Sequence, residues 1–149
     1  DIGAVRLTER FITTNPILKH ERDLTEAHVD AQLDTIVANL NSQPFDKIIA
    51  VAGTPSTLAA AMLGGFDAQK VHGYLLSQDV LRKWCDLFVQ TSVEERIKKY
   101  QLEPGRADVI FTGATILHRF LLKTNRPEMM VSTKGVRYGV ALEALSRII

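Results

Sequence analysis

The chain has 149 residues, of which 46% are hydrophobic and 23% charged, enough for one folded domain and too few for two large ones. The 18 Lys and Arg residues nearly balance 17 Asp and Glu residues, for a net charge of +1, which excludes the basic field that gathers nucleic acid or anionic membranes non-specifically. No apolar run is long enough to span a bilayer, and the single cysteine, Cys85, cannot form an internal disulfide. We therefore expect a folded cytoplasmic protein without nucleic-acid or membrane partners.

Two helices are predicted before the first strand. Apolar residues near the start of the chain, at Ala4, Leu7 and Phe11, favour a short helix over a strand. Apolar residues at helical spacing then predict a helix over 25–40, which Pro44 follows.

The first predicted strand is followed by a tight turn and a helix. The continuous apolar run over 48–52 is typical of a strand buried on both faces, and Gly53 closes it. Thr54 is placed to cap the next helix, with Pro55 as its first residue. Gly64, which precedes a second glycine, is expected to end that helix.

A long helical connection is predicted next. From Ser77 onward, apolar residues recur at helical spacing through Phe88. Ser92 and Glu95 have the spacing of a capping box, which predicts a second helix that continues to Tyr100.

The last third repeats the pattern of strand and helix. The run over 108–112 predicts a strand that Gly113 ends, with a helix over 116–122. A third strand is predicted over 129–132, with a helix over 136–149 after a short loop. Alternating strands and helices indicate an α/β domain with a mainly parallel sheet and flanking helices. Ligands of such sheets gather at the carboxyl ends of the strands.

The turn after the first strand is the strongest candidate for a phosphate or nucleotide site. Gly53 lets the backbone approach a ligand, and Thr54, Ser56 and Thr57 add hydroxyl groups at a helix start, where the helix dipole favours an anion. The alternative is an ordinary capped turn, which is common in α/β proteins. The turn at Gly113 has less polar support and is interpreted as packing.

Cations elsewhere give weaker candidates. Lys134 and Arg137 follow the last predicted strand, where they could meet phosphate oxygens or form an exposed, solvated pair. Arg106 and Asp108 lie at the start of the strand predicted over 108–112, so we expect them to form a structural ion pair at the end of the sheet opposite the ligand site, although Arg106 could still meet a partner domain. The histidines lack metal-ligand spacing, and no metal site or catalytic pair of carboxylates is predicted.

Five segments in this order resemble the Ppx/GppA phosphatase family over nearly the whole chain. They are GAVRLTE (3–9), VAGTPSTLA (51–59), VHGY (71–74), RADVI (106–110) and VSTKGVRYG (131–139). Members are exopolyphosphatases or guanosine pentaphosphate phosphohydrolases with the actin-like fold, in which two ribonuclease-H-like domains surround a cleft. The resemblance implies that 1–149 form most of the second, C-terminal domain, without the first domain.

The resemblance also implies which parts of the site the chain carries. In that family the catalytic glutamate and one phosphate loop lie in the first domain, and an Asp-Ile-Gly-Gly-Gly-Ser loop opens the second. The opening Asp-Ile-Gly of this chain is not that loop, because Ala4 follows it. The resemblance therefore implies no catalytic residue here, and the chain alone should be inactive. Phosphate-binding candidates are Gly53, Thr54, Ser56, Thr57, Arg137 and Arg106. The implied cofactor is magnesium, with ligands outside this chain. The implied partners are polyphosphate or guanosine pentaphosphate and the first domain. Tyr138 stands where some relatives have Glu.

Two alternatives stay open from the sequence alone. One is a non-catalytic α/β module for binding or dimerisation, since a single half of such a protein would expose the face that meets its partner, and a homodimer would cover it. The other is a domain of another actin-like phosphotransferase, which would require ATP and an acceptor.

Overall fold

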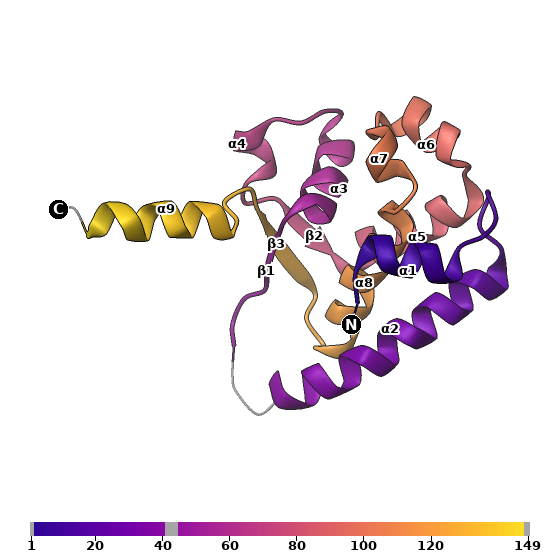
Figure 1. Cartoon of the computed structure of the whole chain (residues 1–149), viewed down its shortest axis with the longest axis horizontal. Coiled ribbons are helices and arrows are strands. Elements are labelled where there is room, and N and C mark those ends of the chain that lie inside the picture. Colours follow the sequence, from indigo (N-terminus) through magenta and orange to yellow (C-terminus); the bar gives the residue numbers. More distant parts are fainter. Residues whose placement is uncertain (1, 41–44, 148–149) are drawn as a thin grey trace.

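The computed structural model describes residues 2–40 and 45–147. They form a small sheet with helices packed against one face (Figure 1). In chain order the elements are α1 (Ala4–Phe11), α2 (Lys19–Leu40), β1 (Ile49–Val51), α3 (Gly53–Leu63), α4 (Ala68–Val71), β2 (Leu75–Ser77), α5 (Gln78–Gln90), α6 (Val93–Tyr100), α7 (Pro104–Ala107), α8 (Ile110–Lys123), β3 (Glu128–Ser132) and α9 (Val136–Ser146).

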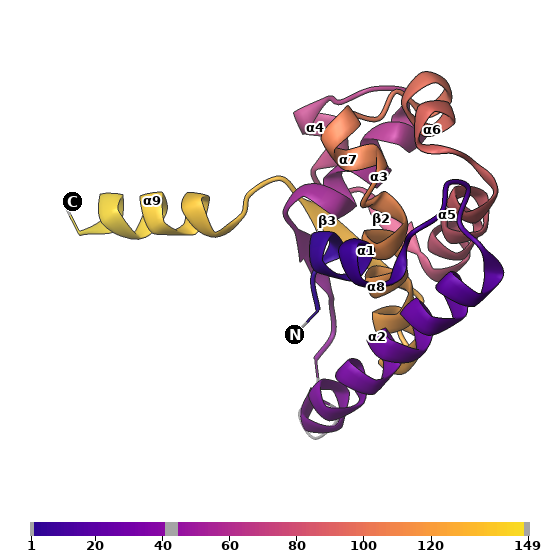
Figure 2. The same ribbon diagram turned by 45° about the vertical axis from the view of Figure 1, so that its right-hand side comes forward.

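The last helix, α9, projects away from the rest of the chain (Figure 1), and the turned view in Figure 2 shows the same separation. None of its residues is buried. Its apolar side chains include Val136 at 80% exposure and Leu145 at 58%. Among the described residues, no helix combines the length and apolar character needed to cross a membrane.

The sheet has the strand order β1-β3-β2 in the described residues. β1 pairs with β3 in parallel, as the sequence predicts, and β2 pairs with β3 antiparallel. The sheet is therefore mixed. The sequence analysis missed β2, because a strand of three residues is too short to show an alternating pattern.

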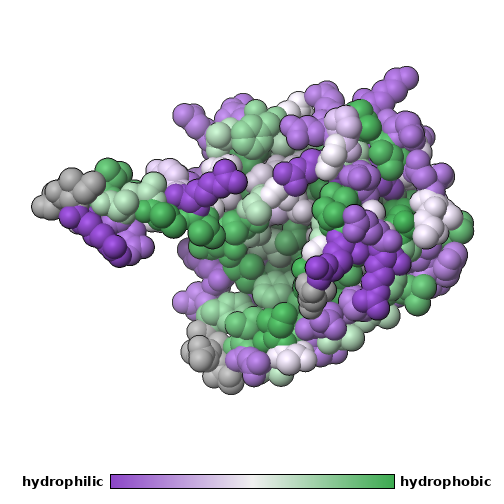
Figure 3. All heavy atoms as spheres, viewed as in Figure 1, coloured by the Kyte–Doolittle hydropathy of each residue, from purple (hydrophilic) through white to green (hydrophobic). Residues whose placement is uncertain are grey.

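One face of the sheet is open. Ile49, Met130 and Leu75 align across β1, β3 and β2 on this face, where Ile49 is 55% and Leu75 51% exposed. Val51 is also exposed, so the prediction that this strand is buried on both faces is wrong: within β1 only Ala50 is buried, and Ile48, just before β1, packs partly against the core. Figure 3 shows hydrophobic side chains gathered over β1 and the base of α9.

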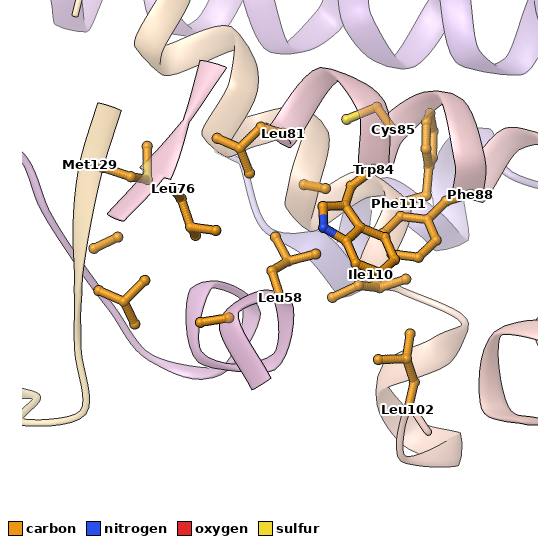
Figure 4. Close-up of a cluster of buried hydrophobic side chains, with 14 of the residues drawn as sticks. Leu58, Leu76, Leu81, Trp84, Cys85, Phe88, Leu102, Ile110, Phe111 and Met129 are labelled. Carbon is orange, nitrogen blue, oxygen red and sulfur yellow. The ribbon is translucent and has the colours of Figure 1, made fainter. Parts of the chain in front are cut away.

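The main core lies between the other face of the sheet and the helices α3, α5 and α8. Leu58, Leu76 and Phe111 are among its fully buried side chains, and Figure 4 shows Leu58 and Phe111 near Trp84 and Leu76 beside Met129. A smaller cluster joins α1 to α2 through Leu7, Val29, Leu33 and Val37.

The predicted strand over 108–112 is wrong, because these residues enter α8. This helix contacts α1, α2, α3, α5 and α7, so its first six residues, 110–115, are all buried. A helix buried all round its first turns has the same continuous apolar run as a buried strand. Gly113, interpreted as packing, lies inside α8 where α3 approaches: a Cβ atom there would come within 2.7 Å of Thr54 Cγ2.

Several predicted helix limits are confirmed, but α2 begins at Lys19 rather than at 25, and α8 begins at Ile110 rather than at 116. The predicted end of the last helix, at 149, lies outside the described residues. Ser77 caps α5, and Ser92 with Glu95 forms the capping box of α6. α3 ends at Gly64 in the left-handed conformation. The start of α3 differs from the prediction: it begins at Gly53 with Ala52 as its N-cap residue, so Thr54 is not the cap.

Candidate functional site

Two pockets adjoin the first turn of α3, and both are lined by Gly53, Ser56 and Phe66. The Arg106 pocket has a volume of about 420 Å³ and is otherwise lined by Thr57, Ala60, Ala61, Gly65, Tyr100, Gln101, Leu102, Glu103 and Arg106. The Arg137 pocket has a volume of about 720 Å³ and is otherwise lined by Val51, Ala52, Ser132, Thr133, Gly135, Val136, Arg137 and Tyr138.

The position of Arg106 differs from the sequence prediction. Because 108–109 form a turn and 110–112 begin α8, Arg106 lies in the short helix α7, which brings its side chain back to the first turn of α3. Its guanidinium group covers Gly53: a Cβ atom there would come within 2.7 Å of Arg106 Cζ. Among the described residues no ion pair joins Arg106 to Asp108, so the predicted structural pair is wrong.

The two cations after β3 have different surroundings. Arg137 lines the Arg137 pocket, in the first turn of α9. Lys134 lines neither pocket, and its Nζ lies 5.0 Å from the ring centroid of Tyr138. The loop before α9 is shaped by Ser132, whose hydroxyl accepts a hydrogen bond from Lys134 N at 3.1 Å. The structure therefore brings Arg137, and not Lys134, to the turn at Gly53.

The threonines of α3 separate into two roles. Thr57 lines the Arg106 pocket, whereas Thr54 lines neither pocket and packs against Gly113 of α8. The structure thus brings Gly53, Ser56, Thr57, Arg106 and Arg137 to the two pockets and directs Thr54 toward the helix packing.

The link between β1 and α3 has an unusual backbone. Ala52 has φ 80° and ψ −164°, a combination that is strained for residues other than glycine. Ser56 Oγ donates a hydrogen bond to Ala52 O at 3.0 Å. This sharp link lets Gly53 begin the helix directly after β1, so the unpaired N–H groups of the first turn lie beside both pockets.

The chemistry of both pockets favours an anion. Two guanidinium groups, the hydroxyl groups of Ser56 and Thr57, and the positive end of α3 adjoin the same turn. Glu103 is the acidic side chain that lines the Arg106 pocket, and the Arg137 pocket has none. Within 2–40 and 45–147, no group of three or more His, Cys, Asp and Glu residues is placed to hold a metal ion.

Sequence reasoning missed the aromatic wall of the Arg106 pocket. Phe66 and Tyr100 line it, and Phe66 is 67% exposed. The available signal was a bulky apolar residue after Gly64 and Gly65 in an otherwise polar loop. Tyr100 follows the helical spacing of α6 and carries no separate signal.

Two relatives with assigned names align with nearly the whole length of this chain. The chain is 26% identical to Exopolyphosphatase 2 of Mycobacterium tuberculosis over 95% of its length, which covers 46% of that protein. It is 29% identical to a bifunctional 3-dehydroquinate synthase/phosphatase of Fusobacterium nucleatum over 97% of its length, which covers 22% of that protein. The chain therefore spans less than half the length of each of these relatives.

A solved structure and a family model give the same assignment. The crystal structure of the Ppx/GppA family member of Aquifex aeolicus matches 98% of this chain with a TM-score of 0.89 and 33% identity, over 47% of that chain. The model of the Ppx/GppA phosphatase family matches residues 1–148. The chain therefore belongs to the Ppx/GppA phosphatase family and has its actin-like, ribonuclease-H-like α/β fold.

Proposed function

We propose that this chain is the phosphate-binding, second domain of an enzyme that releases terminal phosphate from inorganic polyphosphate or guanosine pentaphosphate. The observation that carries the proposal is the contact between Arg106 and Gly53 at the first turn of α3. It places a cation and the N–H groups of a helix start beside the same pocket. Family membership and the exopolyphosphatase name of the mycobacterial relative support the substrate class.

The residues of this chain would act by positioning and charge. Hydrolysis of a terminal phosphoanhydride proceeds by in-line attack of water, and catalysis of such reactions depends mostly on holding the phosphoryl group and neutralising its oxygens. Arg106 would bind phosphate oxygens in one pocket and Arg137 in the other. Ser56 and the N–H groups of the α3 start would hold the oxygens between them.

Other parts of the reaction are assigned outside this chain. In the described part of the chain, no group of three or more His, Cys, Asp and Glu residues is placed to hold a metal ion, and we propose that magnesium and the catalytic base are held by a first domain. The predicted consequence is that the chain alone binds phosphate chains and does not hydrolyse them.

The test measures phosphate release with magnesium from polyphosphate and, separately, from guanosine pentaphosphate. It compares the complete two-domain protein with this chain alone. We expect release by the complete protein and none by the chain, and the faster substrate defines the activity. Release by the chain alone would contradict the division of the site, whereas no release by either protein, with both folded, would contradict the enzyme assignment.

One observation favours a second candidate, a module for binding or dimerisation. Ile49, Leu75 and the apolar side chains of α9 are exposed, and hydrophobic side chains gather over β1 and the base of α9 (Figure 3). A contiguous exposed apolar patch is typical of a surface that binds a partner. In the enzyme proposal a first domain covers part of this surface. In the alternative a second copy of the chain covers it, and the chain has no affinity for phosphate chains.

A further inference from the structure

We propose that Arg96 is a positioning residue that holds α7 in place, so that Arg106 reaches the turn at Gly53. This inference rests on the proposed function of the Arg106 pocket and adds a residue that does not line it. Arg96 lies in α6 and is only 1% exposed.

The guanidinium group of Arg96 joins two helix ends. Its Nη2 donates hydrogen bonds to Phe88 O and, at 2.9 Å, to Thr91 O, at the end of α5. Its Nη1 donates to Ala107 O at 2.9 Å, at the end of α7. Carbonyl groups at helix ends have no partner within the helix and favour a cation. One buried side chain therefore fixes the end of α7 to the end of α5.

A buried guanidinium group lowers the stability of the fold unless its hydrogen bonds to the three carbonyl groups are kept. Burial lowers the pKa of Arg96, and the nearby charges of Asp108 and Glu94 oppose the shift. Arg96 forms no ion pair among the described residues, and its Nε has no hydrogen-bond partner. A cation kept in such a place contributes through the carbonyl groups it holds, since an apolar residue there would leave them unpaired.

α7 needs an external anchor. It has four residues, from Pro104 to Ala107, too few to be stable as an isolated helix. Arg106 immediately precedes Ala107, whose carbonyl accepts the bond from Arg96. The side chain of Arg106 lies on Gly53 without an ion pair among the described residues. Its position therefore depends on where the backbone of α7 is held.

The test is a double-mutant cycle in the complete two-domain protein, with tripolyphosphate as substrate. We expect Arg106→Ala to raise KM about tenfold, the loss of one charged hydrogen bond, and Arg96→Gln to raise KM with a smaller change in kcat. If Arg96 acts through Arg106, Arg96→Gln has no further effect on KM once Arg106 is Ala.

The matched control is Arg22→Gln, which breaks the contact of Arg22 with Asp86 between α2 and α5, at 2.7 Å. Both glutamine variants should lower Tm, and only Arg96→Gln should raise KM. If Arg96→Gln fails to fold, Arg96→Lys keeps the buried charge. Hydrogen exchange at the amides of Arg106 and Ala107 should then be faster than in the unchanged protein, without a matching increase in the other helices.

The outcomes separate this inference from the proposed function. An unchanged KM in Arg106→Ala would overturn the phosphate role of the pocket, and the role of Arg96 with it. A raised KM in Arg106→Ala, with an unchanged KM in folded Arg96→Gln or with additive effects in the double variant, would overturn the positioning role alone. In Arg96→Lys, unchanged exchange at Arg106 and Ala107 would overturn it too.

Discussion

Arg106 covers the α-carbon of Gly53 so closely that the two positions constrain each other. A Cβ atom at Gly53 would come within 2.7 Å of Arg106 Cζ, which is closer than side chains approach in folded proteins. The atom it would meet is the far end of a flexible side chain, so the arginine and not the backbone would move. The guanidinium group of Arg106 can therefore keep this position only if residue 53 is glycine.

Replacement of Gly53 by Ala should therefore weaken phosphate binding and leave the fold intact. The new methyl group displaces the Arg106 guanidinium, and the loss of its contact with a phosphoryl oxygen should raise the dissociation constant of tripolyphosphate by about tenfold. Calorimetric titration of the variant and of the unchanged chain measures the effect.

The control for this variant is Gly139→Ala, where a Cβ atom meets no other atom within 4 Å. It should leave tripolyphosphate affinity unchanged. Equal affinities of the Gly53 variant and the unchanged chain would show that Arg106 does not touch the ligand from this position.

A second close approach joins α3 to α8, at Thr54 and Gly113. Gly113→Ala should lower the free energy of unfolding by about 1–3 kcal/mol, because the added methyl overfills a packed contact. Thr54→Ala removes the side-chain atoms that it meets, so the double variant should recover most of the loss. Urea unfolding of the two single variants and the double variant measures the coupling, and additive losses would contradict it.

The sequence predicts the elements whose signals are local. The capping box at Ser92, the glycine stop at Gly64 and the helical spacing of 25–40 depend on neighbouring residues, and the structure confirms them. The strand over 108–112 fails because burial of α8 by other helices erases the polar face that distinguishes a helix. Tertiary contacts supply that burial, so a local window does not contain it.

The candidate site divides in the same way. The turn at Gly53 is local, so the sequence predicts it as a candidate site, and the structure has it beside both pockets. Because a strand was wrongly predicted over 108–112, Arg106 was expected at the wrong end of the sheet. The sequence also gives no sign of the link from Arg96 to Ala107, because the acceptor is a backbone carbonyl group, which every residue has. The motif resemblance retained Arg106 as a candidate where the local pattern argued against it.

The carboxylate of Glu21 should make stability depend on pH. Burial would raise the pKa of Glu21, but hydrogen bonds from Thr14, Leu18 and Thr13 lower it to about 2. A group whose pKa is lower in the folded state stabilises the protein above its unfolded pKa, near 4.5, and loses this effect as pH falls through the folded value. Stability should therefore fall between about pH 5 and pH 2.

Glu21→Gln tests this assignment. The variant should be less stable at pH 7, because an amide cannot accept all the hydrogen bonds that converge on the carboxylate. Its free energy of unfolding should also change less than that of the unchanged chain over the acidic range. The control is Asp23→Asn, which removes an exposed ion pair with Lys19 on the same helix and should change stability little. Parallel pH profiles of the unchanged chain and the Glu21 variant would contradict the assignment.

The exposed apolar side chains of α9 should make the isolated chain self-associate. Leu142 and Leu145 are 54% and 58% exposed, and no residue of α9 is buried. Burying such side chains between copies removes apolar surface from water, which stabilises the association by about 25 cal/mol for each Å² buried. Sedimentation velocity should show association that grows with protein concentration and weakens in the double variant Leu142→Gln, Leu145→Gln.

The matched control is Leu122→Gln, which changes a side chain of α8 that is 40% exposed and should leave association unchanged. A chain that stays monomeric as concentration rises, with affinity for tripolyphosphate, would leave the first domain as the partner of this surface and remove the homodimer.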